Sequence, residues 1–220
     1  MNWLLIVSFL SLLWVVSLCK VLCSTLSSSK DAFISNGEDD QKRNILLVIA
    51  HPDDESMFFS PTILYLTSKG HILHILCLST GNADGKGNVR KEELYHACSA
   101  LKVPVRQVKV LDHKDLQDGF DQMWSSSLVA EIIEQETADL GIDMISTSLL
   151  RKYMGPLDVW ISILFARSSP EVQTHCLLNE HPHESFIAMG QHRSQWVWFR
   201  KLFVIFSSYT YVNVLRKINY

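Results

Sequence analysis

The sequence predicts an α/β fold with a mostly parallel sheet, preceded by one N-terminal transmembrane helix. Short apolar runs predict buried strands at residues 44–50, 71–78, 107–111 and 142–147. Segments with helical spacing follow the first three runs, at residues 60–69, 89–101 and 124–136. Strands that alternate with helices form parallel sheets with right-handed crossovers, so we expect a Rossmann-like fold of three layers.

Local signals support these helices and strands. Ser60 is a suitable N-cap with Pro61 at the first helical position, and Gly70 fits the end of the same helix. The second helix carries apolar residues on one face, at Leu94, Ala97, Cys98 and Leu101. The glycine-rich loop at 80–88 is not a dinucleotide fingerprint, because it follows the second strand and lacks GxGxxG.

Composition narrows the class of protein. A chain of 220 residues has room for one domain with a substantial core. The net charge of −3 and the lack of a basic stripe argue against a nucleic-acid partner. The five cysteines are odd in number and form no CxxC pair, so neither a disulfide framework nor a cysteine zinc site is expected.

The N-terminus predicts a membrane anchor at residues 1–23, because residues 3–19 are apolar apart from serines. A cleaved signal peptide is the alternative, although no Lys or Arg precedes the apolar run. Basic residues after the run favour a cytosolic location for the C-terminal domain. Residues 24–43 predict a flexible linker, and residues 44–220 predict the globular domain.

Ionisable residues crowd the end of the first predicted strand, in the sequence IAHPDDE. One imidazole and three carboxylates stand there, at His51, Asp53, Asp54 and Glu55. Such a group beside a core strand is costly unless a metal ion or a substrate compensates its charge. A solvated turn is the alternative, since Pro and Asp are common turn residues.

Two further polar loops follow strands in the same way, at residues 80–88 and 112–121. In parallel sheets, ligands bind beyond the carboxyl ends of the strands. We therefore expect these loops to meet residues 51–55 at one edge of the sheet. For the glycine-rich loop, a flexible surface loop is an equally good interpretation.

The motif AHPDDE, with STGNADGKGNVRKEEL after it, resembles the LmbE-like, or PIG-L-type, de-N-acetylase family. The resemblance covers about residues 44–145 and resumes over 148–220 with LLRKYMGPLDVW and QHRSQWVWFRKLF. In that family a zinc ion assists the removal of acetate from an amino sugar. The resemblance implies that His51 and Asp54 are zinc ligands and that Asp53 is the general base.

Two further positions match the family. Arg90 and Glu93 fit its R-x-x-E pattern, which implies that Arg90 helps to bind the substrate; an ion pair at the start of a helix is the alternative. His192 fits a histidine in the HRSQ segment and is also expected to bind substrate, unless it is a helix-surface histidine.

The resemblance also implies a substrate and a place in the cell. The expected reaction is de-N-acetylation of an N-acetylglucosaminyl-phosphatidylinositol lipid in GPI-anchor biosynthesis. The expected location is the endoplasmic reticulum membrane, with a single span and a cytosolic catalytic domain. The aromatic and basic segment 196–206 suits a membrane interface, or else a core element with two snorkelling cations.

The sequence departs from the family at one place. After the strand expected at 142–147 the family carries GVSGHxNH, which supplies the third zinc ligand, whereas this chain passes from GIDMI straight to STSLLRKY. The domain is thus expected to be shortened internally near 145–148. His113 is the better substitute ligand, and the HPHE run at 181–184 is expected to be exposed loop.

Three functions remain open from the sequence. The first is the zinc-dependent amidohydrolase, with impaired activity expected for this chain. The second is a catalytically inactive, membrane-anchored isoform of that enzyme. The third is a secreted sugar-binding domain with a cleaved signal peptide.

Overall fold

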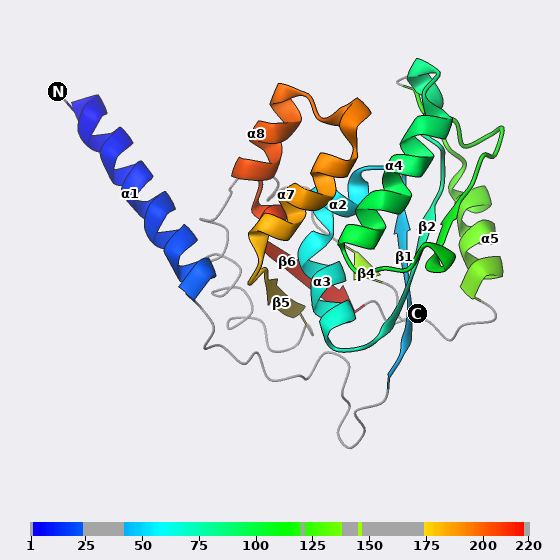
Figure 1. Cartoon of the computed structure of the whole chain (residues 1–220), viewed down its shortest axis with the longest axis horizontal. Coiled ribbons are helices and arrows are strands. Elements are labelled where there is room, and N and C mark those ends of the chain that lie inside the picture. Colours follow the sequence, from blue (N-terminus) through cyan, green and yellow to red (C-terminus); the bar gives the residue numbers. More distant parts are fainter. Residues whose placement is uncertain (1, 24–41, 120–121, 138–144, 147–173, 218–220) are drawn as a thin grey trace.

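A computed structural model describes residues 2–23, 42–119, 122–137, 145–146 and 174–217 of the chain (Figure 1). The first half contains α1 (Asn2–Cys23), β1 (Asn44–Ile49), α2 (Asp54–Phe58), α3 (Ser60–Ser68), β2 (Ile72–Cys77), η1 (Asn82–Asp84), α4 (Gly87–Ala100), η2 (Val105–Gln107) and β3 (Val108–Val110). The second half contains α5 (Ser126–Thr137), β4 (Ile145–Ser146), β5 (Thr174–Leu178), α7 (Pro182–Gln191), η5 (Arg193–Gln195), α8 (Trp198–Phe206), η6 (Ser208–Thr210) and β6 (Val212–Lys217).

A parallel sheet forms the centre of the domain, as the sequence predicts. Its strands follow the order β1-β2-β3, and both strand pairs are parallel. The predicted helices are confirmed as α3, α4 and α5, with boundaries that move by a few residues. The α/β class and its parallel sheet are therefore confirmed.

Alternate residues of β1 face opposite sides of the sheet, which gives the domain its layers. Ile45, Leu47 and Ile49 pack in a core with residues of α3, α4 and α7. Leu46 and Val48 face the other side, where they pack with residues of α5. Because both faces of the strand are covered, its sequence is apolar throughout rather than alternating.

A second sheet, which the sequence did not predict, holds the C-terminal part of the chain. Its order is β4-β6-β5 and both of its pairs are antiparallel. The strand expected at 142–147 is described only at 145–146, and it pairs with β6. The prediction that this strand belongs to the parallel sheet is therefore wrong for residues 145–146.

Asn213 of β6 ties the second sheet to the first half of the chain. Its side-chain oxygen accepts bonds from the Thr62 amide at 3.2 Å and the Thr62 hydroxyl at 2.6 Å. Its side-chain nitrogen donates to the Phe58 carbonyl at 2.9 Å. Asn213 is fully buried, so these bonds satisfy a polar group that would otherwise be costly.

The N-terminal helix α1 lies at one side of the domain, next to α8 (Figure 1). Trp14 of α1 contacts Phe206 of α8, with ring centroids 5.9 Å apart. Within the described residues, no helix has both the length and the apolar character that a membrane span needs. The predicted transmembrane anchor therefore stays a prediction, and the predicted linker lies almost wholly outside the described residues.

Core packing predicts a clear difference between two apolar truncations. Leu66→Ala removes a fully buried side chain from between α3 and the sheet, and we expect it to lower the free energy of unfolding by about 2–5 kcal/mol. Val89→Ala alters a side chain that is half exposed on α4, so we expect a change of less than about 0.5 kcal/mol. Denaturant unfolding of the two variants measures the difference, and equal losses would contradict this packing.

Candidate active site

The site begins where β1 ends, with a strained residue at Asp53. Its φ of 117° lies in the left-handed region, which costs a non-glycine residue about 1–3 kcal/mol. The Asp53 carbonyl accepts bonds from the amides of Ser56 at 3.1 Å and Met57 at 2.9 Å, which starts α2. The turn therefore places the Asp53 carboxylate at the edge of the sheet.

A buried pair, Glu55 and His192, supports this turn from behind. The Asp53 amide donates to one Glu55 oxygen at 3.1 Å, and the Ser56 hydroxyl donates to the other at 2.6 Å. His192 Nε2 lies 2.6 Å from that second oxygen, and both side chains are fully buried. The pair thus holds the backbone conformation on which the position of Asp53 depends.

Glu93 fastens the same C-terminal segment to α4. One Glu93 oxygen accepts the Ser194 amide at 2.7 Å, and the other accepts the Ser194 hydroxyl at 2.6 Å. These bonds fix the turn η5, which directly follows His192. The R-x-x-E pattern therefore connects two distant parts of the chain through Glu93.

Arg90 connects the loops that follow the three parallel strands. Its guanidinium donates to the carbonyls of Pro52 and Gly81, each at 2.8 Å. It also pairs with Asp118 at 3.2 Å and with Asp53 at 3.5 Å. The three polar loops expected at one edge of the sheet are thus brought together. Arg90 lies in the first turn of α4 and forms ion pairs there, as its alternative interpretation expected, and its role in substrate binding stays a prediction.

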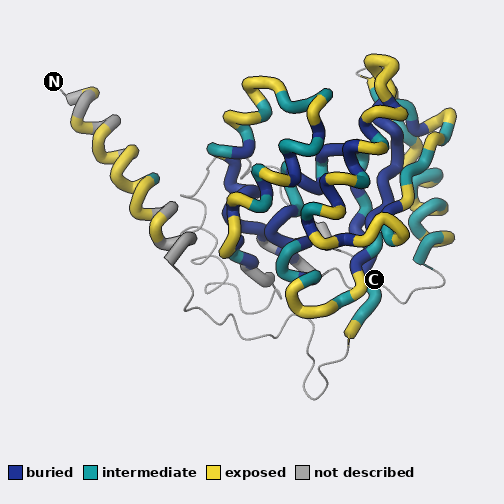
Figure 2. The backbone as a smooth tube through the Cα atoms, viewed as in Figure 1, coloured by how far each residue is buried: buried dark blue, intermediate teal, exposed yellow. Residues whose placement is uncertain are grey.

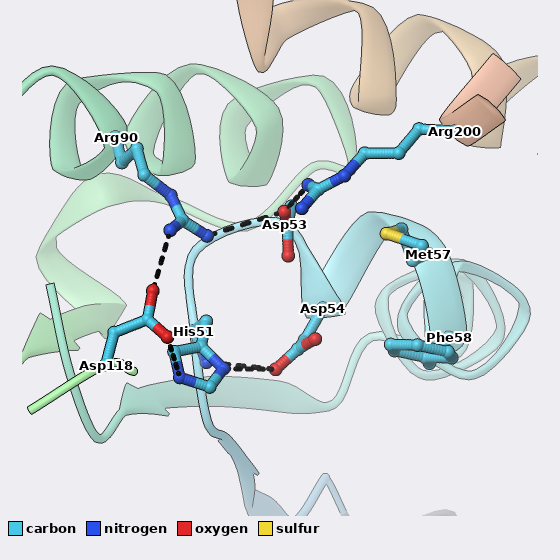
Figure 3. Close-up of a pocket in the computed structure, with 8 residues that line it drawn as sticks. All are labelled: His51, Asp53, Asp54, Met57, Phe58, Arg90, Asp118 and Arg200. Carbon is cyan, nitrogen blue, oxygen red and sulfur yellow. Dashed lines mark hydrogen bonds and ion pairs between the residues drawn. The ribbon is translucent and has the colours of Figure 1, made fainter. Parts of the chain in front are cut away.

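The loops enclose a pocket of about 250 Å³ (Figure 3). Four of its lining residues are expected from the sequence, namely His51, Asp53, Asp54 and Arg90, and four are not, namely Met57, Phe58, Asp118 and Arg200. In Figure 3, Arg90 and Arg200 approach the Asp53 carboxylate, while His51 lies between Asp54 and Asp118. The pocket therefore combines two cations, three carboxylates and an imidazole.

Asp54 and His51 are two polar residues that line this pocket and interact with each other. The His51 amide donates to the Asp54 carboxylate at 2.9 Å, and His51 Nε2 lies 3.3 Å from Asp118. Burial raises the pKa of the Asp54 carboxyl, and the bond from the His51 amide opposes that shift. A cation beside Asp54 would favour its ionised form.

The imidazole and the carboxylate of these two residues are donors that zinc accepts. Among the described residues, however, no three or more histidine, cysteine or acidic side chains are grouped so that they could hold a metal ion. His113, expected as a substitute ligand, is not among the pocket residues and lies 3.8 Å from Asp115. The described residues thus offer two donors without a complete three-ligand set.

The structure places His192 behind the pocket rather than on its wall. It is fully buried beside Glu55, so the helix-surface alternative is wrong. His181 and His183 are exposed as expected, with ring centroids 5.8 Å apart, but the expected loop is wrong because residues 182–184 form the first turn of α7 and Pro182 is buried. None of these three histidines lines the pocket.

Two charged residues of the pocket were missed. Asp118 lies in the polar loop expected at 112–121, and its carboxylate could have been found there as a third acidic group at the same edge. Arg200 pairs with Asp53 across 147 positions of the sequence. From the sequence, segment 196–206 was interpreted only as a membrane interface or a core element. No local pattern connects Arg200 with the motif at 51–55, so its place in the pocket could not be predicted.

Comparison with known proteins gives two kinds of similarity. A family model described as GlcNAc-PI de-N-acetylase (PIG-L) matches residues 46–155. A Bos taurus protein named N-acetylglucosaminyl-phosphatidylinositol de-N-acetylase is 33% identical over 210 residues, which cover 77% of this chain and 81% of that protein. A Schizosaccharomyces pombe protein named as a probable enzyme of this kind is 29% identical and covers 94% of this chain and 99% of its own length.

A solved structure supports the fold. The N,N'-diacetylchitobiose deacetylase from Pyrococcus horikoshii aligns with a TM-score of 0.53 and 13% identity, over 91% of this chain and 92% of that one. The fold, the pocket and the sequence matches together define a hydrolase of the deacetylase class. More particularly, the chain belongs to the PIG-L family of GlcNAc-PI de-N-acetylases.

Two glycines with the same kind of backbone test the role of Arg90. Gly81 and Gly85 have φ of +66° and +70°, so an alanine is strained at either position. A Cβ at Gly81 would lie 2.4 Å from Arg90 Nη1, whereas at Gly85 it would meet nothing within 4 Å. We expect Gly85→Ala to cost about 1–2 kcal/mol of stability, and Gly81→Ala to cost about 1–3 kcal/mol more. Thermal unfolding compares them, and equal stability would mean that Arg90 does not hold this loop.

The buried pair makes a second prediction for stability. His192→Ala leaves the Glu55 carboxyl buried without its imidazole partner, and we expect it to lower the free energy of unfolding by about 3–5 kcal/mol. The matched control His181→Ala removes an exposed imidazole from the N-terminal end of α7, the helix that His192 follows, so we expect a change within about 0.5 kcal/mol. Similar losses in both variants, measured by denaturant unfolding, would contradict a supporting role for His192.

Proposed function

We propose that this chain hydrolyses the acetamide of N-acetylglucosaminyl-phosphatidylinositol, which yields glucosaminyl-phosphatidylinositol for the synthesis of GPI anchors. The pocket at the end of β1, where Asp53 meets His51, Asp54 and Arg90, is the observation that carries this proposal. The family and the relatives named for this reaction support the choice of substrate.

The proposed chemistry assigns the proton transfers to Asp53. Its carboxylate takes a proton from the attacking water as the new bond to the acetamide carbon forms. It returns that proton to the nitrogen as the carbon–nitrogen bond breaks, which leaves a free amine and acetic acid, and the acid ionises to acetate in water. The ion pairs to Arg90 and Arg200 orient the carboxylate for this transfer.

The proposed cofactor is a zinc ion held by His51 and Asp54. Their donor atoms suit zinc, although a catalytic zinc ion takes three protein ligands and these are two. When bound, zinc supplies a water of lowered pKa and an electrophile for the carbonyl oxygen. Arg90, which lines the pocket, is proposed to bind the sugar, and His192 to act through Glu55 on the position of Asp53.

The proposed location is the endoplasmic reticulum membrane, with α1 as a single span and the catalytic domain in the cytosol. The lipid nature of the substrate supports a membrane location. The basic residues that come after the apolar run of α1, such as Lys20 and Lys42, support the orientation.

Asp53→Asn tests the function directly. The amide cannot accept the water's proton, so we expect acetate release from N-acetylglucosaminyl-phosphatidylinositol to fall by about 10²–10⁴-fold. The control Asp84→Asn changes an exposed carboxylate in η1 and should keep full activity. Acetate is measured by an enzyme-coupled assay, with and without a zinc chelator. Undiminished release from Asp53→Asn would remove Asp53 from the mechanism.

A second candidate function is a catalytically inactive isoform, and the direct passage from GIDMI to STSLLRKY favours it. The same assay separates the two, with a version of the chain that carries the family's GVSGHxNH segment at this point. Acetate release from that version alone would assign the inactive role to the present chain.

A further inference from the structure

Helix α8 carries an apolar face on the outside of the molecule. Trp198, Phe199, Leu202 and Phe206 are 72%, 54%, 45% and 52% exposed, whereas Val204 is fully buried. At 3.6 residues per turn the four exposed side chains share one side of the helix, and Arg200 and Val204 lie on the other. Figure 2 shows exposed residues on α8, at the upper edge of the domain, interspersed with more buried ones.

The C-terminal part of the sequence that contains this face is basic. From Ser185 to Tyr220 the sequence contains five Lys and Arg residues and no Asp or Glu, although the whole chain has a net charge of −3. Lys201 of α8 is exposed and lies 5.5 Å from the ring centre of Trp196. Aromatic and aliphatic side chains flanked by cations are typical of helices that lie in the interface of an anionic bilayer.

Helix α1 packs beside this face and carries exposed apolar side chains of its own. Phe206 contacts Trp14 of α1, whereas Leu5, Phe9 and Leu12, on the side of that helix away from Trp14, are 68%, 60% and 61% exposed. Two helices that are far apart in the sequence thus each expose apolar side chains. A surface of this kind on a soluble protein would be a liability for aggregation unless something covers it.

The inner side of α8 is a wall of the active-site pocket. Arg200 lines the pocket and pairs with Asp53, and Phe203 packs against the pocket residue Phe58 with ring centroids 5.6 Å apart. A bilayer on the outer side of α8 would thus lie one helix thickness from the reacting groups. The pocket is small, so most of a lipid substrate must remain outside it.

We propose that α8 is an interfacial helix, which seats the active-site pocket on an anionic lipid bilayer through Trp198, Phe199, Leu202 and Phe206. Lys201 contacts the lipid phosphates at this surface, and the acyl chains of the substrate stay in the bilayer. The use of the surface for substrate delivery rests on the proposed function, whereas docking on the bilayer does not.

Photolabelling of the full chain locates the docking surface without an activity assay. The protein is mixed with vesicles of phosphatidylcholine and phosphatidylserine that contain a phospholipid with a diazirine near its headgroup, and labelled peptides are mapped by mass spectrometry. We expect label within 196–206 as well as within 2–23, and none within 102–109. Label confined to 2–23, or a cross-link from α8 only to another protein, would overturn the proposal.

Paired variants then measure the consequence for catalysis. Trp198→Ser with Leu202→Ser should raise KM for the vesicle-bound substrate by about ten-fold or more, because two large apolar anchors are lost. Activity on the soluble N-acetylglucosaminyl-inositol phosphate headgroup should stay within about two-fold. The control pair is Ile72→Ser with Val105→Ser. Both side chains are exposed near the amino ends of β2 and β3, whereas the pocket lies at the carboxyl ends. This pair should change neither the KM for the vesicle-bound substrate nor the activity on the headgroup.

The outcomes separate docking from the proposed reaction. An unchanged KM in the α8 pair, with normal turnover of both substrates, overturns docking and leaves the function intact. No acetate from either substrate in any variant overturns the function, while the photolabelling result still decides docking. Lys201→Gln should weaken the labelling of 196–206 by about five-fold in vesicles that contain phosphatidylserine, and not in vesicles of pure phosphatidylcholine. Equal weakening in both kinds of vesicle would contradict an electrostatic role for Lys201.

Discussion

The guanidinium of Arg90 is the interaction on which the rest of the site depends. It binds the Pro52 and Gly81 carbonyls and the Asp118 carboxylate, so one side chain joins the loops after β1, β2 and β3. A parallel sheet brings these loops to the same edge but does not fix their distances. Arg90 supplies that constraint, and glycine is required at position 81 because the guanidinium occupies the space of a Cβ. The same group faces Asp53, so the position of the proposed base is coupled to the packing of all three loops.

A second layer of buried polar groups stabilises the strained backbone at Asp53. The positive φ there is unfavourable in isolation, and it persists because Glu55 accepts the Asp53 amide while His192 holds Glu55. Glu93 in turn fixes Ser194 beside His192. The segment from β5 to β6 is therefore part of the site, although among the described residues it contributes only Arg200 to the pocket wall. Catalytic geometry of this kind is supported by groups that need not touch a substrate.

The parts of the fold that the sequence predicted are those that local pattern decides. Apolar runs bounded by turn residues specify β1, β2 and β3, and the Ser60–Pro61 start and the glycine stop specify α3 within one or two residues. The second sheet was not predicted, because its antiparallel pairing of β5 with β6 joins segments about 40 residues apart that carry no alternating pattern. The motif that follows the first strand identified three pocket residues, His51, Asp53 and Asp54, since a parallel sheet places the carboxyl end of a strand at its ligand edge.

By itself, the sequence determined the family, the parallel sheet, and the identity of His51, Asp53, Asp54 and Arg90 as pocket residues. These features depend on residues that are close along the chain, or on one rule of sheet topology. Only the tertiary structure decided that His192 lies behind the site and that Arg200 lies within it. Their partners are 137 and 147 positions away, and such contacts are set by how helices α7 and α8 pack, not by any local pattern. Helix α8 shows the same difference between sequence and structure. Its composition indicated an aromatic and basic segment, whereas only the packing of the helix decided which of its sides faces Asp53.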